Sequence, residues 1–93
     1  MEYPVPKETV TLEYPRTFNG KEYKTLELRR PLVKDQLIAD KQNKDSADKE
    51  IHFMALLAEV DVEVIQMLDL DDYEAVQKKI TGFRKKNAKN SQS

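Results

Sequence analysis

The acidic side chains of residues 69–74, DLDDYE, are the first group in this sequence that could do chemistry, because closely spaced carboxylates bind calcium. A calcium-binding loop has oxygen ligands at alternate positions, a glycine at the sixth position and a glutamate at the twelfth. With Asp69 at the first position, Asp71 fits, but Tyr73 takes the next ligand position and Glu74 takes the place of the glycine. Helix capping and the attraction of carboxylates to a helix N-terminus explain these residues better, so we expect no metal site.

Other arrangements that support catalysis lack essential members. His52 is the only histidine and cysteine is absent, so a zinc site would need carboxylates for its remaining ligands. No serine or threonine lies in a recognisable nucleophile elbow, and two glycines, Gly20 and Gly82, cannot form a glycine-rich phosphate loop. We therefore expect a protein that is not an enzyme and that carries no cofactor.

Two groups of basic side chains could bind an anion. Arg29 and Arg30, within LELRRPLVKDQL (residues 26–37), could hold a phosphate or an acidic partner, or could keep the junction between two elements in water. The C-terminal basic residues, which could contact nucleic acid, are Arg84, Lys85, Lys86 and Lys89. No aromatic side chain is interleaved with them for base stacking, and the net charge is −1, so nucleic acid is disfavoured as a partner.

The elements that must position these residues begin with a β-hairpin. Val10, Leu12 and Tyr14 alternate with polar residues, as do Leu26 and Leu28 in the next segment, and Asn19-Gly20 between them is a strong hairpin signal.

The length of the hairpin loop sets which residues face each other. A two-residue Asn19-Gly20 loop would pair Leu12 with Glu27 and put the two apolar sets on opposite faces. A three-residue loop that also includes Phe18 puts Leu12 opposite Leu26, and Val10 opposite Leu28. We therefore predict the three-residue loop.

Apolar residues recur at helical spacing beyond the hairpin. They predict helices at about residues 31–42, 46–60, 62–68 and 71–86, the last beginning with a capping box of Asp71 and Glu74. We expect a single α+β domain over residues 8–86, in which a hairpin at residues 9–29 packs on a small bundle of three to four helices. An extended lead-in over residues 1–7 and a disordered tail over residues 87–93 complete the expected organisation. No apolar run is long enough to span a bilayer and no segment resembles a signal peptide, so we expect a soluble, intracellular protein without membrane partners.

The order of three segments resembles that of a known protein family. They are VTLEYPRTFNGKEYKTLELRRPLVKDQL, an apolar run with HFMALLAEV, and IQMLDLDDYEAVQKKITGF, in which LDLDDY precedes the last helix. Together they cover roughly residues 8–84 and resemble the small tail assembly chaperones of Mu-type and related bacteriophages and prophages. The resemblance implies a non-catalytic protein of the bacterial host cytoplasm. Such a protein binds the long tape measure protein and promotes assembly of the tail tube around it, with the tail tube protein as a further partner.

The resemblance supplies no binding motif, so candidate contact residues come from the helices and the arginine pair. They are Leu37, Ile38, Tyr73 and Phe83, with Arg29 and Arg30 as contacts for an acidic stretch of a protein partner. The alternative for the four apolar residues is that they belong to the core. The alternative function is a small nucleic-acid-binding regulator that uses the basic C-terminal segment, and a homo-oligomer is compatible with either function.

Overall fold

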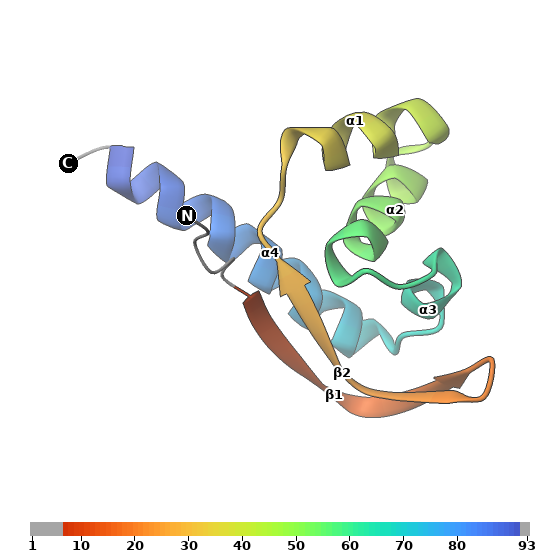
Figure 1. The fold of residues 1–93 in the computed structure, drawn as a ribbon. Coiled ribbons are helices and arrows are strands. Elements are labelled where there is room, and N and C mark those ends of the chain that lie inside the picture. The colour runs from red at the N-terminus through yellow and green to blue at the C-terminus, as the bar shows by residue number, and fades with distance from the viewer. Residues whose placement is uncertain (1–6, 92–93) are drawn as a thin grey trace, which may run out of the picture.

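The computed structural model describes residues 7–91, with side chains described through Phe83. It consists of a two-stranded antiparallel hairpin followed by four helices (Figure 1). In chain order these are β1 (Lys7–Phe18), β2 (Lys21–Arg29), α1 (Val33–Gln42), α2 (Ser46–Ala58), α3 (Val62–Gln66) and α4 (Leu70–Ser91). The predicted α+β fold is therefore confirmed. The lead-in before Lys7 lies outside the described residues, and helix α4 continues to Ser91, beyond the expected end at residue 86.

The hairpin turn contains two residues and not three. Phe18 is paired with Lys21, and both residues between them have positive φ angles, 52° at Asn19 and 78° at Gly20. Asparagine followed by glycine is the preferred sequence for such a turn, because both adopt left-handed backbone angles at little cost. The predicted three-residue loop was wrong, and so was the predicted pairing of Leu12 with Leu26.

An irregular β-bulge in β1 restores the common apolar face of the hairpin. Arg16 is opposite Tyr23, but Thr11 is opposite Thr25, so residues 12–15 of β1 face only Lys24. Because four residues of β1 face one residue of β2, the side chains of residues 7–11 point to the opposite face from the one that an uninterrupted ladder would give them. This change brings Val10 opposite Leu26. Pro15 lies within this bulge, where its missing N–H leaves no hydrogen bond of the ladder unmade.

The hydrophobic core lies between the hairpin and helices α2, α3 and α4. Strand β1 packs along α4, and β2 packs against α2 (Figure 1). The buried apolar side chains of this core are Val10, Leu12, Leu26, Leu28, Met54, Ala55, Leu57, Val64, Ile65, Val76, Ile80 and Phe83. Helix α1 supplies none of them. It packs against α2, and its buried residues are Asp35 and Ala39, so α1 is attached to the outside of the core.

Helix α4 begins at Leu70, one residue before the start that the sequence indicated. The side-chain oxygen Oδ2 of Asp69 accepts a hydrogen bond of 3.0 Å from the backbone N–H of Asp71, and the carbonyl of Asp69 accepts one of 2.9 Å from the N–H of Tyr73. Asp69 is therefore the capping residue, and the predicted capping box at Asp71 and Glu74 was wrong. None of the described helices is long and apolar enough to cross a membrane.

Candidate functional site

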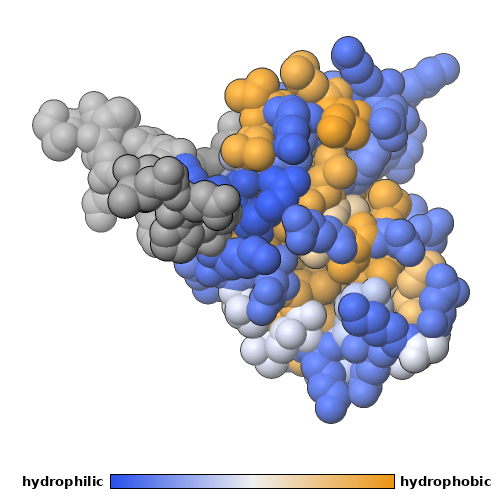
Figure 2. Space-filling model, in the orientation of Figure 1, coloured by the Kyte–Doolittle hydropathy of each residue, from blue (hydrophilic) through white to orange (hydrophobic). Residues whose placement is uncertain are grey.

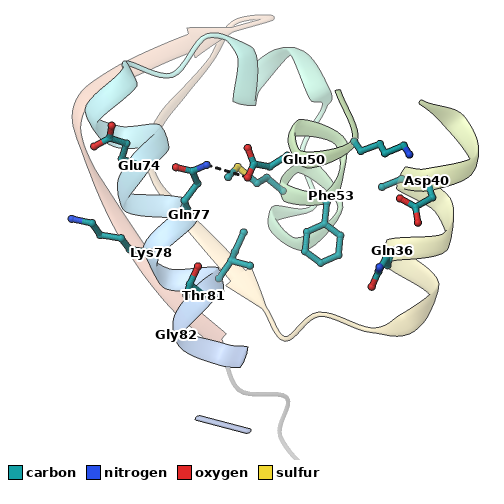
Figure 3. A pocket seen from close by; sticks show the side chains of 13 residues that line it. Gln36, Asp40, Glu50, Phe53, Glu74, Gln77, Lys78, Thr81 and Gly82 are labelled. Carbon is teal, nitrogen blue, oxygen red and sulfur yellow. Dashed lines mark hydrogen bonds between the residues drawn. The ribbon is translucent and has the colours of Figure 1, made fainter. Parts of the chain in front are cut away.

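A groove of about 840 Å³ lies between helices α1, α2 and α4 (Figure 3). Its apolar lining comes from all three helices: Ala39 of α1, Phe53 and Met54 of α2, and Ile80 of α4. The ring of Phe53 extends from α2 into the space between α1 and α4 (Figure 3). Hydrophobic residues therefore form the floor of an open groove.

The walls of the groove are polar and carry both signs of charge. On the α1 side, Gln36 and Asp40 point towards the ring of Phe53 (Figure 3). On the other side, Glu50 of α2 accepts hydrogen bonds from the Tyr73 hydroxyl and from Nε2 of Gln77, at 2.5 and 3.1 Å. These bonds tie α4 to α2 and fix one wall of the groove.

Tyr73, one of the predicted contact residues, is therefore engaged within the molecule. Its side chain is half-buried, and burial raises the pKa of its phenol above the ordinary value, with the Glu50 carboxylate adding to this effect. The phenol consequently keeps its proton and donates a hydrogen bond to Glu50. In this arrangement Tyr73 joins helices α2 and α4.

A stripe of exposed apolar side chains runs along α1, next to the groove. Leu32, Val33 and Leu37 are 52%, 77% and 52% exposed, and Figure 2 shows hydrophobic atoms gathered over this helix. The neighbouring Ile38 is half-buried. We call Leu32, Val33 and Leu37 the α1 stripe. Of the predicted contact residues, Leu37 lies in this stripe.

Arg29 forms an ion pair with Asp35 that joins the end of the hairpin to α1. Its Nη1 and Nη2 atoms lie 2.8 and 2.7 Å from the two carboxylate oxygens, an arrangement in which arginine donates two parallel hydrogen bonds. The backbone N–H of Leu32 donates a third bond of 2.8 Å to Asp35, which is 1% exposed. Nε of Arg29 lies 3.6 Å from Glu59 at the end of α2. The first arginine of the pair is thus held by the fold.

Arg30, the second arginine of the pair, contacts Phe83 of α4. The guanidinium carbon of Arg30 lies 5.8 Å from the centre of the Phe83 ring, within the range of a cation–π contact. Phe83 is 5% exposed and belongs to the core, so it offers little surface to a partner. The structure therefore places Arg29, Arg30 and Phe83 in internal contacts and leaves Leu37 as the exposed candidate.

Comparison with known protein families identifies the family to which this chain belongs. The family model described as "Phage tail assembly chaperone proteins, E, or 41 or 14" matches residues 9–85, which include the complete hairpin turn and helices α1 to α3. The chain belongs to the phage tail assembly chaperone family. No curated protein and no solved structure matches this chaperone significantly.

A buried carboxylate of the chaperone was missed by the sequence analysis. Asp72 is 2% exposed, and its Oδ1 and Oδ2 atoms accept hydrogen bonds from the backbone N–H groups of Glu13 and Tyr14, at 2.9 and 3.1 Å. These two residues lie in the β-bulge, where the ladder provides no partner for them. The sequence feature that pointed to such an acceptor was Pro15. Proline within a strand indicates a bulge, and a bulge leaves backbone N–H groups without partners in the ladder.

His52 of the chaperone also has a structural partner. The side-chain amide of Asn43 donates to Nδ1 of His52 and to the carbonyl of Ala39, both at 2.8 Å. The contact joins the end of α1 to α2. Within residues 7–83, no three histidine, aspartate or glutamate side chains come together in a way that could hold a metal ion.

Proposed function

We propose that this chaperone binds helical segments of the tape measure protein in the groove between α1, α2 and α4, and keeps them soluble until tail tube subunits enclose them. The observation that supports the proposal is the apolar floor of the groove, where the half-buried Phe53 lies with the buried Met54 and Ile80 between two polar walls. Membership of the family places the chain in tail assembly. The role requires binding and release and no catalysis.

The shape and chemistry of the groove fit one amphipathic helix. Such a helix presents apolar residues at positions i, i+3, i+4 and i+7, which would lie on Phe53, Met54 and Ile80. Its polar face would meet Gln36 and Asp40 on the α1 wall. A groove with these walls accepts helices that share a pattern of apolar spacing and does not require one particular sequence.

Release of the partner follows from the small size of each contact. A stable interface between two proteins buries about 800 Å² on each partner, and a short groove on a 93-residue chain offers less than this. Many copies bound along one long helical protein would nevertheless cover it, because each added contact raises the overall occupancy. Tail tube subunits that bind the same helices more extensively would displace the chaperone. We place this exchange in the cytoplasm of the bacterial host.

Co-expression with the tape measure protein tests the proposal. Gln36→Trp places a large side chain at the groove wall from an exposed position, while Lys24→Trp does the same on the hairpin, away from the groove. We expect the wild type and Lys24→Trp to keep the tape measure protein soluble and to copurify with it. Gln36→Trp should leave it largely in the pellet. Equal solubility with both variants would rule out the groove as the binding site, and insolubility with the wild type would rule out the function.

A further inference from the structure

Two large apolar residues of α1, Val33 and Leu37, point away from the core that they would be expected to join. Helical geometry advances by about 100° per residue, so Val33 and Leu37 lie on one face, nearly opposite the buried Asp35 and Ala39. An isolated domain gains stability by turning large apolar side chains inward. Helix α1 instead buries an alanine and an aspartate and exposes the larger apolar side chains of the stripe.

Polar contacts at both ends of α1 hold it in this orientation. At its N-terminus the Asp35 carboxylate is bound by Arg29 and by the N–H of Leu32. At its C-terminus the Asn43 side chain links the carbonyl of Ala39 to His52. These bonds fix the rotation of the helix about its own axis. The fold therefore keeps the α1 stripe on the outside and gives it no partner within residues 7–83.

Charges beside the stripe indicate what it would bind. Lys34 and Lys41 are both exposed and lie on the same flank of Leu37, three residues before it and four residues after it. The opposite flank carries Gln36 and Asp40, which form the groove wall. We propose that the α1 stripe is a second docking site, for an amphipathic helix of the partner that carries acidic residues along the flank facing Lys34 and Lys41. This proposal rests on the proposed function and specifies the partner's chemistry.

A second copy of the chain fits the stripe less well. Three partly exposed side chains provide far less than the about 800 Å² per partner that a stable dimer needs. In an antiparallel contact between two α1 helices, each flank meets the same flank of the other copy, so Lys34 and Lys41 would face lysines. A separate acidic helix avoids this repulsion, and a weak contact is sufficient when a long partner offers many of them.

Two synthetic peptides test the proposal without the tape measure protein. Both are cross-linked to remain helical and carry leucines at positions i, i+4 and i+7, but one has glutamates and the other lysines along one flank. Each is titrated into the full chain while the methyl signals of Val33, Leu37 and Met54 are followed by NMR. We expect the glutamate peptide to shift Val33 and Leu37 and to bind at least tenfold more tightly than the lysine peptide. The double variant Lys34→Glu/Lys41→Glu should reverse this preference.

The control carries the same change in net charge at another place. Lys21→Glu/Lys24→Glu alters two exposed hairpin residues and should leave the preference unchanged. Equal binding of both peptides, or shifts confined to Met54 in the groove, would refute the stripe as a docking site. A dimer in sedimentation experiments that Leu37→Glu converts to monomer would also refute it, because a second copy would then cover the stripe. The co-expression experiment tests the proposed function independently of the peptide titration, so the failure of one proposal can be distinguished from the failure of the other.

Discussion

Asp72 determines whether the β-bulge of the hairpin can form at its observed place. Its carboxylate accepts hydrogen bonds from the N–H groups of Glu13 and Tyr14, and it is almost fully buried. Asp72→Ala leaves two backbone donors without a partner, each of which costs about 1 to 3 kcal/mol. We expect a loss of about 2 to 4 kcal/mol in the free energy of unfolding, measured by urea denaturation. Asp71→Ala, at the exposed neighbouring position, should change stability by about 0.5 kcal/mol or less. Similar losses for both variants would contradict the assigned role.

The ion pair between Arg29 and Asp35 makes stability depend on pH. Hydrogen bonds from Arg29, supported by the N–H of Leu32, hold the pKa of the Asp35 carboxyl below its ordinary value of 3.8 in the folded chain, although burial acts in the opposite direction. A carboxyl group whose pKa is lower in the folded chain stabilises the fold above the ordinary pKa, and this contribution is lost as the pH falls through the folded value.

Asp35→Asn tests this dependence. We expect the variant to be less stable than the wild type by about 2 to 3 kcal/mol at pH 7, because a buried charged acceptor has been removed from Arg29. The difference should shrink steadily below about pH 4, as the wild-type carboxyl becomes protonated. Urea denaturation at pH 7 and pH 3 measures both values, with the exposed Glu27→Gln as control. A difference that stays constant between the two pH values would contradict the assignment.

At the scale of elements, the hairpin shows what the sequence could and could not predict. The alternation of Val10, Leu12, Leu26 and Leu28 correctly required one common apolar face. The alternation did not show where the necessary change in register occurs. An extra residue in the turn and a bulge within the strand both bring the apolar side chains to one face of the hairpin. The structure uses the bulge, since Asp72 supplies the acceptors that it needs. That residue is nearly 60 positions away in the chain, so no local pattern could reveal the pairing.

The helices were predicted more accurately than the candidate site. Apolar spacing located all four of them, because a helix is defined by interactions between near neighbours. Spacing does not reveal how a helix is rotated, and α1 is oriented by polar contacts with Arg29 and His52 from other elements. Leu37 could therefore be named from the sequence as an apolar residue of α1, but its exposure could not be foreseen.

The same substitution at the two glycines should have opposite effects. Neither Gly20 nor Gly82 has an atom within 4 Å of the position that a Cβ would take, so only the backbone decides the outcome. Gly20 has a φ of 78° in the turn, and Gly20→Ala should cost about 1 kcal/mol. Gly82 lies within α4, and Gly82→Ala should add about 0.5 to 1 kcal/mol to the free energy of unfolding. Thermal and urea denaturation measure both changes, and effects of the same sign would contradict the two-residue turn.

At the scale of the whole molecule, the chaperone consists of a core and one helix that lies outside it. The hairpin, α2, α3 and α4 share one cluster of buried apolar side chains, whereas α1 contributes none to it. Helices with few buried apolar contacts open locally at a lower free energy than the core. Helix α1 also carries the stripe and one wall of the groove, so both proposed binding surfaces depend on the helix that lies outside the shared core.

Hydrogen exchange measured by mass spectrometry tests this division. We expect peptides covering α1 to exchange faster than those covering α2 and residues 70–83 of α4, because α1 itself carries only two buried residues, Asp35 and Ala39. Arg29→Gln removes one of the polar attachments, and it should accelerate exchange in α1 about tenfold or more while leaving the rates in α4 nearly unchanged. The exposed Lys24→Gln serves as the control and should change neither helix. If α1 exchanges as slowly as α2, or if Arg29→Gln accelerates every helix equally, then α1 unfolds together with the core, and a separately mobile groove wall is excluded.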